Sequence, residues 1–179
     1  REGEVTLNSS KNSSFIQHLR DNFYFTVKGY QTLFLEALTT GKFNQSMVEQ
    51  HLVPMLEVLD RNKDVVSLLI AFTEEDVNIY NHSLQVGLLS YYIATWLGHP
   101  PNECYEISKA GYLHDIGKSQ VRQSLRNREH ELTGEEREEM NRHTSYGYDI
   151  IRRSTGEEVT ALVALQHHER EDGSGYPAG

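Results

Sequence analysis

The stretch from Glu103 to Gly117 reads ECYEISKAGYLHDIG and predicts a helix that ends in a histidine, an aspartate and a glycine. Glycine is common just past a helix end, so we expect the helix to run to about Asp115 and to stop at Gly117. At that terminus the adjacent side chains of His114 and Asp115 are able to converge on one metal ion. Taken alone, however, such a pair is more typical of the protein surface or of a helix cap.

Helical patterns lie on both sides of this stretch, and no alternating strand pattern competes with them. They cover residues 23–38, 46–59, 65–72 and 73–97 before it, and about 133–151 and 155–168 after it. Residues 1–14 are polar without an apolar period, so we expect a frayed lead-in there. The fold class is therefore predicted to be all-α, with an N-terminal helical region over 1–72 and the main domain over 73–179.

Short local signals mark where these helices begin and end. Gly41 is expected to end the first helix, and Pro54 to kink or split the second. Tyr91, Tyr92 and Trp96 are expected to pack in the core. The predicted helix starts are Ser46 with Glu49, Thr73 with Asp76, Thr133 with Glu136, and Thr155 with Glu158.

The composition excludes several classes of protein. The 17 Lys and Arg against 26 Asp and Glu give a formal net charge of −9, which argues against a nucleic-acid polymer as partner. A single cysteine, Cys104, excludes an internal disulfide and a thiolate zinc site, and it suits the reducing cytoplasm. No apolar run approaches the roughly 20 residues of a membrane span. The sequence begins with Arg1 rather than Met, so we expect it to be a piece of a longer protein.

Further histidines lie within or at the ends of the predicted helices on either side of His114. His82 lies within a helix, His143 follows a capped helix, and His167 and His168 close the last one. Each alone is more typical of a core or surface histidine. Together with Asp115 they form a series of imidazoles and one carboxylate, a ligand set that suits Fe, Mn, Zn or Ni.

The order of these histidines and the residues around them resemble a known family. The order His82, His114-Asp115, His143, His167-His168 is similar to the ligand series of the HD superfamily of metal-dependent phosphohydrolases. Residues 111–118 (GYLHDIGK) resemble the HD motif, residues 132–147 its central helix, and residues 167–177 (HHEREDGSGYP) the signature of the HD-GYP subfamily.

The resemblance implies a phosphodiesterase that opens cyclic di-GMP to pGpG, and sometimes on to GMP, at a centre of two or three Fe or Mn ions. The metal ligands would be His82, His114, Asp115, His143, His167 and His168. Lys118 would meet the scissile phosphate and, with Asp115, act in catalysis. The loop residues Asp172, Gly173, Gly175, Tyr176 and Pro177 would contact substrate or GGDEF-domain partner proteins.

The sequence departs from the family pattern in three places, one of which is the segment 119–128, where the apolar and proline residues common in the family are missing. Asn78 stands where members with three metals carry a glutamate, so we expect two ions. The family's last aspartate ligand and its basic substrate-binding residues come after the position of Gly179. The apolar residues Phe34, Leu38, Leu52 and Met55 are candidates for a homodimer contact through the N-terminal helices.

Two other functions stay open from the sequence. One is an HD phosphohydrolase of other nucleotides or phosphate esters, against which the Gly-Tyr-Pro loop argues. The other is a degenerate, non-catalytic HD-GYP adaptor that binds partners and holds little or no metal; Asn78 and the early end of the sequence motivate it.

Overall fold

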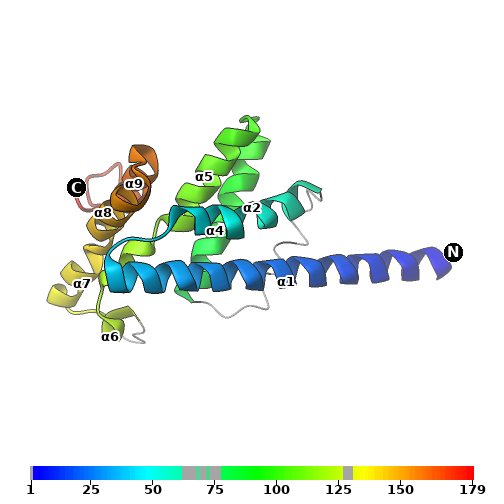
Figure 1. Ribbon diagram of the computed structural model, residues 1–179, viewed down its shortest axis with the longest axis horizontal. Coiled ribbons are helices and arrows are strands. Elements are labelled where there is room, and N and C mark those ends of the chain that lie inside the picture. The colour runs from blue at the N-terminus through cyan, green and yellow to red at the C-terminus, as the bar shows by residue number, and fades with distance from the viewer. Residues whose placement is uncertain (1, 62–67, 69–71, 73–77, 127–130) are drawn as a thin grey trace.

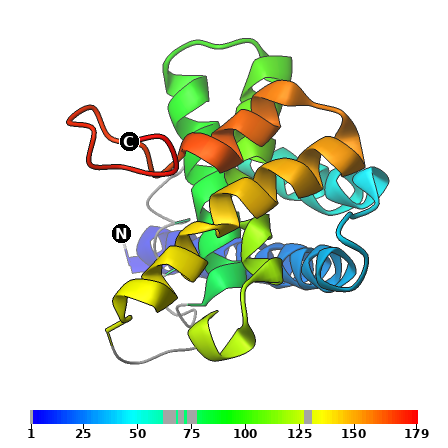
Figure 2. The ribbon, with the colours of Figure 1, turned by 90° about the vertical axis from the view of Figure 1, so that its left-hand side faces the viewer.

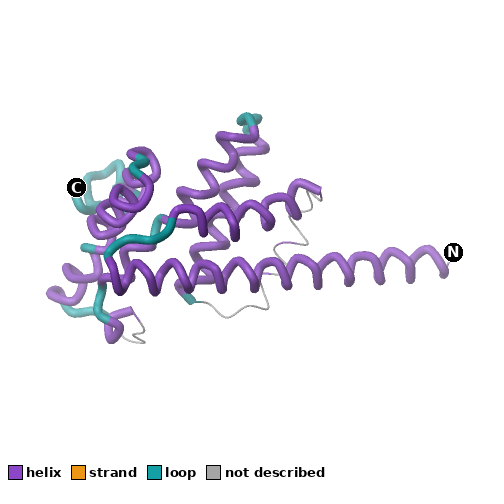
Figure 3. The backbone as a smooth tube through the Cα atoms, viewed as in Figure 1, coloured by secondary structure: helices purple, strands orange, loops and turns teal. Residues whose placement is uncertain are grey.

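The structure is a computed structural model that describes residues 2–61, 68, 72, 78–126 and 131–179 (Figure 1). Every regular element in these ranges is helical and none is a strand, which confirms the all-α prediction (Figure 3). The elements are α1 (Glu2–Thr40), α2 (Gln45–Arg61), α4 (Ile79–Trp96), α5 (Pro101–Leu113), the 3₁₀ helix η1 (Ile116–Gln120), α6 (Gln123–Arg126), α7 (Gly134–Asn141), α8 (His143–Thr155) and α9 (Glu158–Gln166).

Most of the helices pack side by side with a neighbour. α4 packs along α5, and α8 packs on both α9 and η1 (Figure 2). α1 lies against α2, α4 and η1, and its N-terminal part extends beyond the other helices (Figure 1). None of the helices in the described ranges has the length and apolar character needed to cross a membrane.

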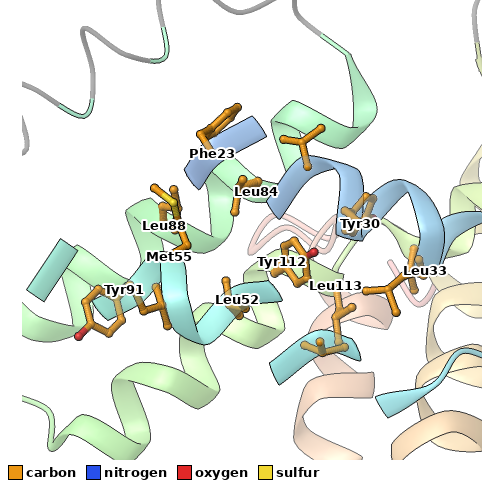
Figure 4. Packing of buried hydrophobic residues seen from close by; sticks show 14 of the residues in the cluster. Phe23, Tyr30, Leu33, Leu52, Met55, Leu84, Leu88, Tyr91, Tyr112 and Leu113 are labelled. Atoms are coloured by element: carbon orange, nitrogen blue, oxygen red, sulfur yellow. The ribbon is translucent and has the colours of Figure 1, made fainter. Parts of the chain in front are cut away.

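One apolar core joins the N-terminal helices to the rest of the bundle (Figure 4). Tyr30 of α1 meets Tyr112 of α5 edge to face at 5.0 Å, and its hydroxyl accepts a 3.1 Å hydrogen bond from Ser83 of α4. Phe34, Leu52 and Met55, which the sequence offered as partner contacts, are buried in this core, and only Leu38 is exposed. Their apolar face is covered within the chain because α1 and α2 pack on each other and on α4 and α5.

Several helix boundaries differ from the predicted ones. α1 begins at Glu2, so the expected frayed lead-in is helical. The side chains of Asn44 and Asn78 accept hydrogen bonds from the backbone at the starts of α2 and α4, so the predicted start of α2 at Ser46 is wrong. An asparagine oxygen caps as well as a serine or threonine oxygen, so the earlier signals were not decisive. α2 runs unbroken past Pro54.

Other boundaries follow the prediction. Thr133 forms the expected capping box with Glu136, and Gly41 takes a left-handed conformation (φ 71°) directly after α1. The predicted helix start at Thr155 with Glu158 is wrong, because Thr155 is the last residue of α8 and Glu157 precedes α9 without a side-chain cap. Tyr91 and Tyr92 are buried as expected, whereas Trp96, the last residue of α4, is 63% exposed. The predicted helix 65–72 and the Thr73–Asp76 start lie outside the described residues, apart from the buried Leu68 and Phe72.

Candidate metal centre

The ends of three helices bring most of the predicted ligands together. His114 caps the C-terminus of α5, His143 is the first residue of α8, and His167 caps the C-terminus of α9. Asp115 lies between α5 and η1, and its side chain is buried among these imidazoles. His82 reaches the same centre from the first turns of α4.

Gly117 sets the spacing between these elements. A Cβ atom at this position would overlap the carbonyl oxygen of His143 and the backbone of Gly147, so only glycine lets η1 lie directly on α8. The sequence predicted that Gly117 stops a helix; instead it lies inside η1. Its role is close packing, which local sequence does not reveal.

Asp115 is the shared partner of the imidazoles. Its Oδ1 lies 3.3 Å from His143 Nε2 and 3.5 Å from His167 Nε2. Its Oδ2 lies 3.2 Å from His114 Nε2 and 4.0 Å from His82 Nε2. The ligand atoms form two groups that share this carboxylate: Asp115, His143, His167 and His168 in one, and His82, His114 and Asp115 in the other, each within 4.8 Å.

Backbone contacts fix the orientation of three of the rings. The Nδ1 atoms of His114, His143 and His167 lie 2.6, 2.7 and 2.9 Å from the carbonyl oxygen of the residue three positions earlier. A carbonyl oxygen only accepts hydrogen bonds, so each Nδ1 carries the proton. In the neutral rings the Nε2 lone pairs therefore point at the centre, as in metal-ligating histidines.

The donor set fits a bound cation. Within the described ranges Asp115 Oδ1 is buried without a hydrogen-bond partner, and His143 Nε2 faces His167 Nε2 at 3.3 Å. Acceptors this close repel one another unless a positive charge lies between them. Atoms bound to one ion by bonds of about 2.0–2.2 Å lie roughly 3.0–3.5 Å apart, which is the spacing observed here.

The environment also sets the charge of the ligands. Burial opposes ionisation of Asp115, but the adjacent imidazoles of His114, His143 and His167 outweigh it and hold its pKa well below the usual range. Burial, and after it the neighbouring imidazoles of His167 and His143, lower the pKa of His168 to about 4. Burial likewise lowers the pKa of His82. At neutral pH both rings are neutral and able to bind metal.

Lys118 contacts the centre directly. Its Nζ donates a 2.6 Å hydrogen bond to Asp115 Oδ2, one turn of η1 after the carboxylate. The side chain stays 22% exposed, so the ammonium faces both the ligands and the surface.

The loop after α9 divides into an inner and an outer part. Asp172, Gly173 and Pro177 are exposed, as expected of a contact loop, whereas Gly175 and Tyr176 are partly buried. The ring of Tyr176 stacks on His168, with centroids 4.7 Å apart and planes inclined by 17°. Sequence reasoning assigned Tyr176 to the loop surface and missed this contact.

Behind the ligands lies an apolar cavity of about 680 Å³ between α4, α5 and α9. His114 and His167 form part of its lining, together with Val86, Ile107 and Val163. The sequence gave no indication of it, because its walls come from three separate helices.

The comparison with protein families agrees with this geometry. Residues 55–179 match the model of the HD domain. The chain belongs to the HD domain family. The likeness of this HD domain to cyclic di-GMP phosphodiesterases places it in the HD-GYP branch, as the motifs predicted.

Named relatives share both the HD domain and part of the N-terminal region. The chain is 34% identical to a cyclic di-GMP phosphodiesterase of Thermotoga maritima over 90% of this chain and 42% of the relative. It is 34% identical to the cyclic di-GMP phosphodiesterase response regulator RpfG of Xanthomonas campestris, over 75% of this chain and 36% of the relative. It is also 29% identical to the 3'3'-cGAMP-specific phosphodiesterase 2 of Vibrio cholerae, over 75% of this chain and 26% of the relative. The chain thus spans less than half the length of each relative.

Proposed function

We propose that this chain carries the catalytic centre of a metal-dependent phosphodiesterase that opens cyclic di-GMP to pGpG. The observation that carries the proposal is the buried carboxylate of Asp115, which two groups of imidazoles share at 3.2–4.0 Å. In this proposal the domain of residues 73–179 supplies the chemistry, and α1 and α2 of the N-terminal region pack on it.

The residues support a centre of two ions, Fe or Mn. His143, His167 and His168 would hold one and His82 and His114 the other, with Asp115 between them. When bound, the ions would supply a hydroxide at neutral pH and positive charge for the phosphoryl oxygens. Asn78 supports two ions rather than three, because its side-chain oxygen accepts hydrogen bonds from Tyr80 N and Asn81 N as the cap of α4.

The chain's own groups have separate tasks in this reaction. The carbonyl contacts of His114, His143 and His167 keep their rings aimed at the centre before substrate arrives. The ammonium of Lys118 has donors left beside its bond to Asp115, and these would neutralise a non-bridging oxygen of the scissile phosphate. The exposed residues Asp172, Gly173 and Pro177 would contact substrate or a GGDEF-domain partner.

Asp115→Ala tests the centre most directly. We expect loss of both ions by elemental analysis and loss of pGpG formation from cyclic di-GMP, measured by chromatography on Mn- or Fe-loaded protein. Helicity by circular dichroism should stay, because the helices do not depend on this side chain for their core. Asp149→Ala, an exposed acid on α8, is the matched control and should keep both ions and activity.

Two outcomes would separate the competing functions. A wild-type protein that carries no stoichiometric metal would be an adaptor rather than an enzyme. A metal-loaded protein that spares cyclic di-GMP but cleaves another member of a panel would act on other phosphodiesters. The panel includes 3'3'-cGAMP and linear RNA, because 3'3'-cGAMP phosphodiesterases and a ribonuclease Y (33% identical over 95 residues) are among the relatives.

We further propose a cytoplasmic protein that forms a homodimer through α1. The single thiol, Cys104, is free and buried, as suits a reducing compartment. Tyr24, Phe25, Leu35 and Leu38 leave apolar surface exposed along α1. Light scattering of the wild type and of Leu35→Glu measures whether this face joins two copies.

A further inference from the structure

The segment after α9 folds back on the helix end that carries His167 and His168 (Figure 2). Tyr176 N donates a 3.2 Å hydrogen bond to His168 O. The carboxylate of Glu169 accepts hydrogen bonds from Ala178 N at 2.7 Å and Gly179 N at 3.2 Å. These bonds close residues 168–179 into a loop fixed at both ends.

His168 differs from the other imidazoles of the centre in how it is held. His114, His143 and His167 each donate from Nδ1 to a backbone carbonyl. Within the described part of the chain, the His168 ring makes no such bond. Its large neighbours are instead rings: His167 at 4.2 Å, Tyr176 stacked at 4.7 Å, and His143 edge-on at 5.2 Å.

Gly175 is what brings Tyr176 onto that ring. A Cβ atom at Gly175 would lie 2.6 Å from both Glu169 Cα and His168 O, closer than any real contact of that kind. Only glycine therefore lets the backbone pass the end of α9 at this distance. The next residue then turns its ring onto His168 and towards His143, whose centroid is 6.3 Å away.

We propose that Tyr176 is a positioning residue that orients the His168 imidazole for metal binding by stacking on it. This stacking contact takes the place of the backbone hydrogen bond that orients His114, His143 and His167. The inference rests on the proposed function in that His168 is taken as a ligand. It assigns the tyrosine of the Gly-Tyr-Pro loop an inward role, separate from any partner contact by the exposed Asp172 and Pro177.

Titration of the full chain with Mn²⁺ and Co²⁺ tests this. We expect Tyr176→Leu to weaken one of the two sites by about tenfold or more, the usual effect of losing a residue that supports a ligand, and to alter the Co²⁺ absorption bands. Tyr176→Phe keeps the ring and should bind as the wild type does. Gly175→Ala, which displaces the loop while keeping the tyrosine, should weaken the same site. Glu171→Gln, at an exposed position of the same loop, is the control.

A double-mutant cycle distinguishes positioning from a general effect on folding. In a His168→Gln background, Tyr176→Leu should cause no further loss of affinity, because the ring it orients is gone. The proposal would be overturned by an equal loss of metal affinity in both backgrounds or by wild-type metal affinity in Tyr176→Leu. It would also be overturned if Tyr176→Phe bound metal as weakly as Tyr176→Leu. A wild type that takes up no metal would instead overturn the metal centre itself.

Discussion

Asp115 Oδ2 has two kinds of neighbour, a cation and imidazole nitrogens. Lys118 Nζ lies at 2.6 Å and His114 Nε2 at 3.2 Å from the same oxygen. In the proposed reaction, the charge of Lys118 would meet the incoming phosphate beside the ligands, and the His143 side of the carboxylate would be left to the imidazoles.

Lys118→Met should lower kcat for cyclic di-GMP by about 100-fold while both ions stay bound, because it removes a donor to the phosphate and leaves every ligand in place. Steady-state kinetics with elemental analysis of the same samples measures both. Lys28→Met, an exposed lysine on α1, should behave as the wild type. Metal lost in parallel with activity would show that Lys118 acts only by holding Asp115.

At the scale of elements, the centre depends on how closely η1 lies on α8. Gly117→Ala should lower the free energy of unfolding by about 1–3 kcal/mol and weaken metal binding, because the added methyl forces η1 and Asp115 away from His143. Urea denaturation and metal titration measure the two effects. Gly134→Ala, whose added Cβ would meet no atom within 4 Å, should change stability by less than about 0.5 kcal/mol. A stable Gly117→Ala variant with normal metal affinity would contradict this account.

An ion-pair network around the buried Lys109 joins α5 to the start of α9. Lys109 Nζ contacts Glu106 at 2.7 Å and Glu157 at 2.8 Å, and its ammonium lies 5.2 Å from the Tyr105 ring centroid. Burial lowers the pKa of Lys109, but the hydrogen bonds that its ammonium donates to the two carboxylates outweigh it and raise that pKa above its usual value. The network fixes α9, and with it His167 and His168.

This network predicts a loss of stability at high pH. A raised lysine pKa means that the stabilisation is complete below the unfolded-state pKa and is lost as pH rises through the folded-state value, above pH ~10. Lys109→Met should lose about 1–2 kcal/mol at neutral pH and show a shallower alkaline decline, measured by urea denaturation across pH. The buried tyrosines titrate in both proteins, so the difference between the curves reports Lys109. Parallel curves would refute the assignment.

At the scale of the whole molecule, the N-terminal helices and the ligand-bearing helices share one core. Leu52 of α2 is fully buried in it. Leu52→Ala should cost about 2–5 kcal/mol and lower the thermal midpoint of the entire chain in a single transition, because the cavity lies between the two regions. Leu35→Ala, at a 58% exposed position on α1, should change little. Two separate transitions would show instead that residues 1–72 unfold independently.

Local sequence patterns were enough to predict that the chain is helical and which residue types would serve as metal ligands. Apolar spacing predicted most helices, and Thr133 and Gly41 set boundaries where expected, since capping and left-handed glycine depend on a few neighbouring residues. The start of α2 was misplaced because several polar residues nearby are able to cap. Trp96 was assigned to the core because helical spacing does not show where the neighbouring helix ends.

By itself, the sequence determined an all-helical chain with five imidazoles and one carboxylate in the order typical of its family. Only the tertiary structure decided that Gly117 is a packing residue, that Asp115 lies between two groups of imidazoles, and that Tyr176 stacks on His168. The physical reason is that helical periodicity and capping act over a few residues. The Gly117 and Asp115 contacts instead join segments up to about fifty residues apart, and their distances follow from how closely whole helices pack. The Tyr176 contact depends on how the loop folds back on the end of α9.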